Sequence, residues 1–246
     1  MERRLYQFPL SLYCEKSRWN LEQKKLSYTP VNLMPGPHIL TAFRLGRIRT
    51  LPVLADKSRR IGDSTRIALY LDQHYPEHPL LSAESDKRGA ILALEDYFDD
   101  VGDHIRRCVW NEAVHSEQVN EIFFRDYDEK MQRVGAFAKP LLRQMIKRTF
   151  NVAPAAVEAS WQAAFTAFLH LEAMLHNDPQ RYLVGEHFTL ADLTAATMLA
   201  PLLGPEQSPW PDRHLPVTGI SRRSELRATV AGQWVLRIYA QHRKSS

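Results

Sequence analysis

Three short segments carry side chains that could bind or activate a small ligand. The first is S-x-x-C, in which Ser11 stands where a strand pattern passes into a helix pattern, with Cys14 one helical turn later. A helix N-terminus presents backbone N–H groups, and a serine hydroxyl adds one more donor, so an anion could be held here. At an arbitrary strand-to-helix junction the plainer interpretation is that Ser11 only caps the helix, which contributes about 1 kcal/mol.

The other two segments are predicted to lie beside Ser11. Leu51-Pro52-Val53-Leu54 begins a strand pattern with a proline, and Asp63-Ser64 stands at a second strand-to-helix junction, where Ser64 offers an N-cap. Ligands of open α/β sheets bind outside the carboxyl ends of strands. No helix uses the backbone N–H and C=O of Leu51, and a cis bond before Pro52 would hold that edge toward a peptide-like ligand. Three junctions are therefore predicted to meet at one sheet end.

The elements that would position these residues alternate between strand and helix. Strands are predicted at residues 4–8, 28–33, 52–55 and 59–62, and helices at 13–25, near 39–45 and from 64 to 74. The first strand, helix and second strand form a βαβ unit, so its two strands should be parallel. Prolines 76 and 79 then interrupt the pattern, which places the end of an α/β domain at residue 78.

The remainder of the chain, residues 86–246, is predicted to be an all-helical domain. Amphipathic stretches indicate helices at 86–110, 155–176, 190–203 and 224–242, with a further helix of less certain ends within 117–150. The most apolar of these regions, 191–203, is far below the roughly 20 residues that cross a bilayer, so no membrane span is predicted.

Composition narrows the class of protein. Of 246 residues, 44% are hydrophobic and 24% charged, which is typical of a folded globular protein, and the net charge of +4 is too small for a dedicated nucleic-acid binder. The two cysteines, Cys14 and Cys108, match no zinc-ligand spacing, and Pro76 separates His74 from His78, so no metal site is predicted. A reducing cytoplasm is the simplest setting for such a chain.

The element order and the three junction motifs together resemble the glutathione transferases, specifically the serine/cysteine-type, bacterial-like cytosolic members. The segment from Phe188 to Leu193 is similar to the family's capping box and hydrophobic staple, with Thr189 as cap, Asp192 reaching back and Phe188 packing on Leu193. The resemblance covers nearly the whole chain. It implies a thioredoxin-like N-terminal domain, residues 1–78, and an all-α helical-bundle domain, residues 86–246.

The resemblance also implies roles for individual residues toward glutathione. Ser11 matches the residue that faces the glutathione sulfur and is the implied catalytic residue. The implied glutathione-binding residues are Leu51 with Pro52 for the cysteinyl part, Asp63 with Ser64 for the γ-glutamyl amine and carboxylate, and His38 or Arg49 for the glycyl carboxylate. Two departures stand out: Gly46 to Thr50 replaces the family's common N-P-x-G-K, with one residue fewer between His38 and Pro52, and Asp63 replaces the commoner glutamate.

The implied chemistry is the stabilisation of a thiolate. Lowering the pKa of a free thiol by about two units takes roughly 2.7 kcal/mol. A hydroxyl hydrogen bond to an anion contributes about 1.5 to 3 kcal/mol and a helix N-terminus about 0.3 to 2 more, so Ser11 at its helix start suffices. Ser11 acts as a donor, because its own pKa is far too high to accept the thiol proton.

The expected reaction is conjugation of glutathione, the only implied co-substrate, to a small hydrophobic electrophile, with peroxide reduction as a second use. The electrophile is expected near residues from both domains: Phe8, Pro9, Leu10, His104, Arg107 and Trp110, for each of which a role as core or surface filler stays open. A homodimer, detoxification and no nucleic-acid or membrane partner are implied. Two alternatives remain: a non-catalytic binding or regulatory protein, and a glutathione-dependent thiol reductase in which Cys14 faces the ligand.

Overall fold

The structure is a computed structural model that describes residues 3–35, 38–115, 127, 129–130, 132–133, 139–210, 212 and 217–244. The chain divides into two compact units. The first contains Met1–Glu95 and Tyr182–Thr197, and the second contains Asp96–Arg181 and Met198–Ser246. The sequence predicts a boundary between two domains, at residues 78 to 86. That boundary stays a prediction, because the two compact units are not continuous in the chain.

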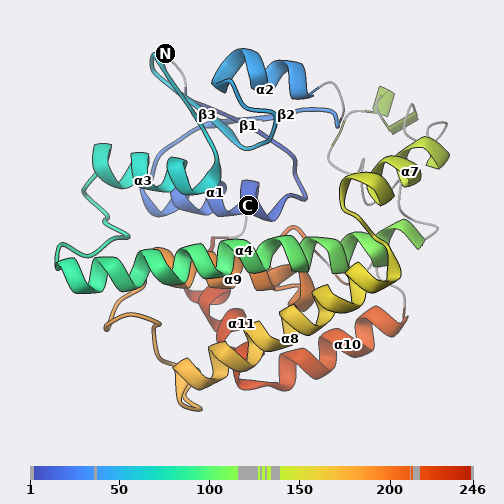
Figure 1. Ribbon diagram of the computed structural model, residues 1–246. Helices are drawn as coiled ribbons and strands as arrows, with labels where there is room; N and C mark the ends of the chain where they lie inside the picture. Colours follow the sequence, from blue (N-terminus) through green and yellow to red (C-terminus); the bar gives the residue numbers. More distant parts are fainter. Residues whose placement is uncertain are drawn as a thin grey trace. The chain divides into compact units, whose positions relative to one another are not determined.

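The first unit is built on a mixed four-stranded sheet (Figure 1). Its strands are β1 (Arg4–Gln7), β2 (Thr29–Asn32), β3 (Val53–Asp56) and β4 (Arg59–Gly62), in the order β2-β1-β3-β4. β1 and β2 pair in parallel, as the βαβ pattern predicts, whereas β3 is antiparallel to both β1 and β4. β1, β2 and β4 lie within the predicted ranges, whereas β3 begins and ends one residue later than the predicted 52–55.

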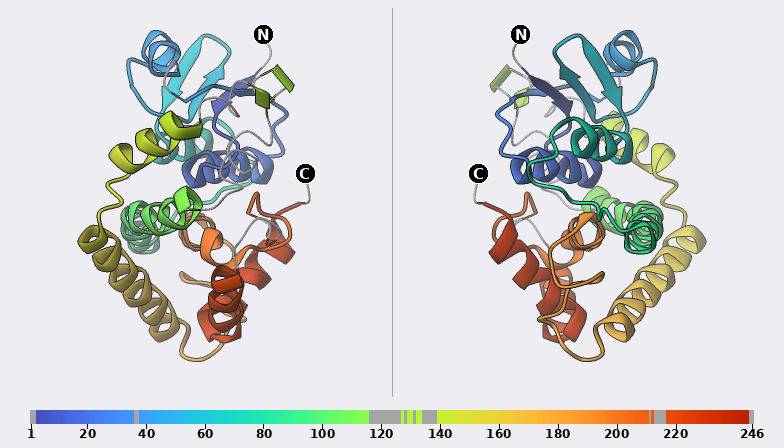
Figure 2. Two further views of the ribbon diagram at one scale, coloured as in Figure 1. Left: turned by 90° about the vertical axis from the view of Figure 1, so that its right-hand side faces the viewer. Right: turned by 90° about the vertical axis from the view of Figure 1, so that its left-hand side faces the viewer.

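Helices cover both faces of this sheet (Figures 1 and 2). α1 (Leu12–Gln23) and α3 (Ser64–His74) lie on one face, and α2 (His38–Gly46) lies on the other. Because successive strand residues point to opposite faces, Leu54 packs with residues of α1 and α3, whereas Val53 packs with Ala42 of α2. This α/β arrangement confirms the thioredoxin-like fold predicted for the N-terminal domain.

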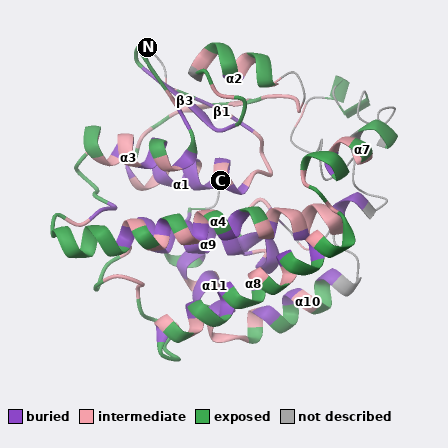
Figure 3. Ribbon diagram, in the orientation of Figure 1, coloured by how far each residue is buried: buried purple, intermediate pink, exposed green. Residues whose placement is uncertain are grey.

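The rest of the described chain is helical. Its helices are α4 (Ser85–His115), α7 (Lys139–Thr149), α8 (Pro154–Leu175), α9 (Leu190–Leu203), α10 (Val217–Ala228) and α11 (Val230–His242). Buried residues follow one side of α8 and α11, as the purple segments of Figure 3 show. The helix predicted within 117–150 lies mostly outside the described residues, and α7 forms its described end. None of the helices in the described ranges combines the length and the apolar character that a bilayer crossing needs.

The prediction of one helix over 224–242 is wrong, because the chain forms two helices that meet at Thr229. The Thr229 hydroxyl caps α11 by accepting the N–H of Gly232 at 3.0 Å. A Cβ on Gly232 would lie 1.9 Å from the carbonyl oxygen of Leu226. The end of α10 and the start of α11 therefore approach so closely that only glycine fits at position 232. The four-residue spacing of apolar positions continues across the break, which is why periodicity alone missed it.

Candidate functional site

The strand register gathers the three junctions at one edge of the sheet. Tyr6 near the end of β1 pairs with Val53 at the start of β3, and Val53 pairs with Gly62 at the end of β4. The residues that follow β1, precede β3 and follow β4 therefore leave the sheet at the same edge. These are the segments that contain Ser11, Leu51-Pro52 and Asp63-Ser64.

Ser11 is the N-cap of α1. It has extended backbone geometry (φ −80°, ψ 125°), and its Oγ accepts the N–H of Cys14 at 3.3 Å. Its own N–H donates to the carbonyl of Phe8 at 3.2 Å, which fixes the turn that leads from β1 into the helix. The side chain is half-buried. The hydroxyl uses a lone pair for the cap and carries one proton, which it can donate to one acceptor at a time.

Cys14 lies behind Ser11 and is fully buried, with 0% of its surface exposed. Its Sγ accepts the N–H of Phe8 at 3.4 Å. Burial raises the pKa of this thiol, and the positive charge of Arg18 and a hydrogen bond from Ser11 oppose that shift only in part. A buried, protonated thiol is a poor nucleophile, so Cys14 acts as a core residue here.

The second and third junctions are bonded to each other. The Leu51–Pro52 peptide bond is cis, and both residues are buried. The carbonyl of Pro52 accepts the N–H of Asp63 at 3.2 Å. The chain segment before β3 and the start of α3 are thereby held together.

The expectation that Ser64 caps α3 is wrong by one residue. Asp63 is the N-cap, and its carboxylate accepts the N–H of Arg66 at 3.0 Å, while Ser64 is the first helical residue and is buried. The reason is the backbone of Asp63, whose φ of 76° turns the carboxylate toward the first turn. The carboxylate of Asp63 is exposed beside a helix N-terminus, where an anionic cap is favourable.

His38 lies near the first junction. Its ring packs edge-on against Phe8, with 4.7 Å between the ring centroids. Burial lowers the pKa of the imidazole, although hydrogen bonds to the backbone of Arg49 and Met34 favour the charged form. Arg49 itself is exposed. His38 and Arg49 are thus neighbours, and their role toward a ligand carboxylate stays a prediction.

The residues predicted for a second substrate fall in both units. Phe8, Pro9 and Leu10 are half-buried after β1. In α4, His104 Nδ1 and Arg107 Nη1 lie 3.1 and 2.6 Å from Ser160 Oγ of α8, and Trp110 stacks on Phe150 with 5.4 Å between ring centroids. Their contacts hold α4 to the neighbouring segments, and a role in substrate binding stays a prediction.

Arg18 is a residue of the first unit that sequence reasoning missed. Its guanidinium donates to Glu15 at 2.7 Å, to Gln7 Oε1 at 2.8 Å and to the carbonyl of Pro9 at 2.9 Å. It therefore fixes the turn between β1 and α1. The i,i+3 spacing of Glu15 and Arg18 could have indicated an ion pair, but no pattern indicates the bonds to Gln7 and Pro9.

The described side chains form no cluster typical of a metal site. Within the described ranges, no three His, Cys, Asp or Glu side chains gather closely enough to hold a metal ion. Cys14 and Cys108 are both free thiols and both buried. The donors that gather at the sheet edge are hydroxyl, backbone and carboxylate groups, which suit an amino-acid-like ligand.

The first unit has a thioredoxin-like fold, its sheet edge carries the three junctions, and helices follow it in the chain. Comparison with known protein families identifies the class to which this arrangement belongs. The family profile "Glutathione S-transferase, N-terminal domain" matches residues 5–79, and the profile "Glutathione S-transferase, C-terminal domain" matches residues 154–217. Together they match more than half of the chain. The chain belongs to the glutathione S-transferase family.

Individual relatives agree with this assignment. The chain is 39% identical over 70 residues to a "Glutathione S-transferase zeta class" protein of Euphorbia esula, a match that spans 28% of this chain and 31% of that protein. The chain thus spans about a third of the length of this curated relative.

Solved structures share the fold. A glutathione S-transferase from Methylobacterium radiotolerans, in complex with glutathione sulfonate, aligns with a TM-score of 0.57 at 20% identity over 96% of this chain and 95% of that one. A glutathione S-transferase from Methylobacillus flagellatus with glutathione bound aligns with a TM-score of 0.58 at 18% identity over 95% and 98%. At these identities the likeness concerns the fold alone.

Proposed function

We propose that the protein is a glutathione transferase that conjugates the glutathione thiolate to a hydrophobic electrophile, with peroxide reduction as a second reaction. The observation that carries the proposal is the meeting of three junctions at one sheet edge. They supply a hydroxyl donor at Ser11, a backbone edge at Leu51 and an acid-capped helix start at Asp63 and Ser64.

Each part of the tripeptide has a proposed partner. The backbone of Leu51 pairs with the cysteinyl residue, and the carboxylate of Asp63 binds the γ-glutamyl ammonium group. Ser64 and the start of α3 bind the γ-glutamyl carboxylate, because helix N-terminal N–H groups favour anions. His38 or Arg49 binds the glycyl carboxylate. This binding holds the sulfur at Ser11.

Ser11 is proposed to donate its hydroxyl hydrogen bond to the glutathione sulfur anion. The thiol proton leaves to water, and the hydroxyl and the N-terminus of α1 stabilise the charge that remains. The thiolate then attacks the electrophilic atom of the second substrate and forms a carbon–sulfur bond as the leaving group or an electron pair departs. Phe8, Pro9, Leu10, His104, Arg107 and Trp110 are the residues proposed to contact that substrate.

Further proposals concern the setting of the reaction. A homodimer is supported by the family assignment and by Phe165 and Leu169, large apolar side chains of α8 that are 48% and 66% exposed. A cytoplasmic location and a role in detoxification fit such a transferase and two free thiols. No nucleic-acid or membrane partner is proposed. Glutathione is the proposed co-substrate, without a metal.

The two alternatives differ in their support. A thiol reductase needs an accessible Cys14, and the burial and raised pKa of that thiol oppose it. A non-catalytic binding protein would keep the Ser11 hydroxyl only as a helix cap. The altered segment 46–50 is compatible with that alternative, and a titration of bound glutathione distinguishes the two.

The test is a titration of bound glutathione, followed by the ultraviolet absorbance of its thiolate, in the wild type and in Ser11→Ala. Loss of one hydrogen bond to the anion should raise the thiol pKa by about one to two units. Thr229→Ala is the matched control, because it also removes an N-cap but from α11. Cys14→Ala should leave the titration unchanged.

Three results would contradict the proposal. If only Cys14→Ala abolishes the depressed titration, the reductase interpretation is favoured. If wild type and Ser11→Ala titrate alike, the hydroxyl serves only as a cap. If the wild type binds no glutathione, the protein is a binding module for some other partner.

A further inference from the structure

A buried polar cluster in the first unit links α1, α3 and the part of α4 that belongs to this unit. Lys16 of α1 forms an ion pair with Glu95 of α4, and its Nζ also lies 3.1 Å from Thr65 Oγ1 of α3. The Thr65 hydroxyl donates to Glu95 Oε1 at 2.7 Å. Lys16 and Glu95 are 0% and 2% exposed. We call these three residues the Lys16–Glu95–Thr65 cluster.

The Thr65 hydroxyl is hydrogen-bonded to both charged members of this cluster. It accepts a hydrogen bond from the ammonium group of Lys16 and donates its only proton to the carboxylate of Glu95. Both charges are removed from water, which is costly unless every polar group is paired. Such mutual pairing fixes the rotamer of Thr65, and with it the first turn of α3.

The cluster lies directly behind the proposed glutathione site. Thr65 follows Ser64, and Lys16 lies about one and a half turns beyond Ser11 along α1. The cluster therefore joins the two helix starts that the proposed function assigns to the sulfur and to the γ-glutamyl group.

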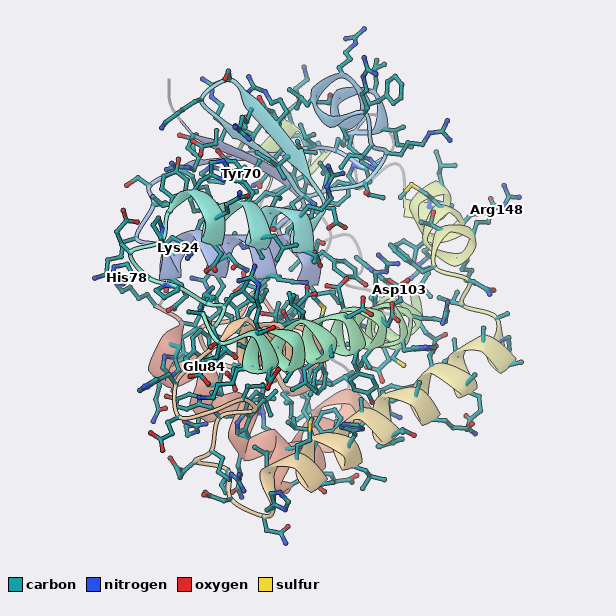
Figure 4. The ribbon with its side chains drawn as sticks, turned by 60° about the vertical axis from the view of Figure 1, so that its left-hand side comes forward. Lys24, Tyr70, His78, Glu84, Asp103 and Arg148 are labelled. Atoms are coloured by element: carbon teal, nitrogen blue, oxygen red, sulfur yellow. The ribbon has the colours of Figure 1, made fainter. Side chains whose placement is uncertain are left out.

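A second ion pair, with a buried lysine and a partly buried aspartate, joins the same two helices at their other ends. Lys24, the C-cap of α1, lies 2.7 Å from Asp72 of α3 (Figure 4 labels Lys24). Since Lys16 meets Thr65 and Lys24 meets Asp72, α1 and α3 run in parallel with their N-termini side by side. Of these two groups, the Lys16–Glu95–Thr65 cluster adjoins the N-termini, and the Lys24–Asp72 pair offers a comparison at the far ends.

We propose that Lys16, Glu95 and Thr65 are positioning residues that set the separation between Ser11 and Asp63-Ser64, and so determine the affinity for glutathione. The inference rests on the proposed function. The cluster holds the two helix starts at one spacing, so that a tripeptide can reach both of them at once. Without it, α1 and α3 remain joined at their far ends by Lys24 and Asp72, while their N-termini gain freedom to separate.

The test measures binding of glutathione and of S-methylglutathione by calorimetry. S-methylglutathione has no ionisable thiol, so its affinity reports on the peptide contacts without the thiolate at Ser11. Thr65→Val, which keeps the Lys16–Glu95 ion pair, is expected to raise the Kd of both ligands about tenfold. Lys24→Met, which removes the comparison pair, is expected to lower stability but to change Kd by less than about threefold.

A double variant separates positioning from stability. Lys16→Met should destabilise the protein by leaving Glu95 buried without its partner, and adding Glu95→Leu should recover the unfolding midpoint. The proposal requires Kd to stay raised in the double variant, because Thr65 still lacks both partners.

Two outcomes overturn the proposal alone. In one, Kd returns to the wild-type value together with the recovered stability; in the other, Thr65→Val and Lys24→Met weaken binding equally. If the wild type binds neither ligand, the proposed function fails and this inference fails with it.

Discussion

Asp192 provides the sharpest quantitative prediction. Its carboxylate is fully buried and accepts the N–H of Leu183 and both the N–H and the hydroxyl of Thr189, each at 2.8 Å. These bonds favour the charged form, but burial outweighs them and raises the pKa of Asp192 to about 6. The capping-box pattern in the sequence predicts that Asp192 reaches back to Thr189, and the hydrogen bond from the N–H of Thr189 is that contact.

The raised pKa makes stability depend on pH. The folded protein holds the Asp192 proton more tightly than the unfolded chain, whose reference pKa is 3.8. The stabilisation is therefore fully present below that value and is lost as pH rises through about 6. A shift of about two units corresponds to about 3 kcal/mol, of which about 2 kcal/mol is lost between about pH 4 and about pH 7.

The assay is urea unfolding of wild type and Asp192→Asn across this pH range. Asparagine does not titrate, and its NH2 group cannot accept a hydrogen bond from the donors that face it. The variant should therefore be less stable by about 1 to 3 kcal/mol at low pH. The advantage of the wild type should shrink by about 2 kcal/mol as pH rises. An advantage that is constant or grows with pH would refute the reasoning, since the hydrogen bonds would then outweigh burial.

Two further predictions concern tight packing and buried thiols. Gly232→Ala should lower the free energy of unfolding by about 2 kcal/mol or more, because its Cβ would meet a backbone carbonyl at 1.9 Å. Gly89→Ala is its control: a Cβ there meets nothing within 4 Å, so this substitution should leave stability unchanged or raise it by up to about 1 kcal/mol, and equal losses in urea unfolding would contradict the argument. Cys14 and Cys108 should both resist a thiol reagent in the folded protein and react once it is unfolded, since burial raises both pKa values, that of Cys108 to about 12. Rapid modification of the folded protein would disprove the burial of the modified thiol.

Local patterns in the sequence were sufficient for much of the first unit. Apolar-polar alternation located β1, the polar turn at residues 56–58 indicated β3 and β4 on either side of it, and the βαβ order predicted the parallel pairing of β1 with β2. The same reading placed Ser11 at the start of α1, where the structure has it as the N-cap. Each of these features depends on residues close together in the chain, so their types and spacing carry the information.

Errors occurred where short-range chemistry was ambiguous. Asp63 and Ser64 are both good caps, and only the positive φ of Asp63, which the turn after β4 imposes, decides between them. The break at Thr229 was hidden because apolar residues recur every four positions on both sides of it. Both the N-cap of α3 and the break between α10 and α11 are therefore decided by the packing of the surrounding chain, and not by residue type alone.

What the sequence by itself determined is the order of elements, the α/β character of the first unit and the three junctions that meet at its sheet edge. Only the tertiary structure decided the buried partners: Lys16 with Glu95, Lys24 with Asp72, and Asp56 with Arg3 and with the hydroxyls of Tyr70 and Tyr75. The physical reason is that a buried charge must find its partner wherever helices and strands bring it, and that partner can lie 79 residues away, as Glu95 does from Lys16. No spacing in the chain encodes such a pair.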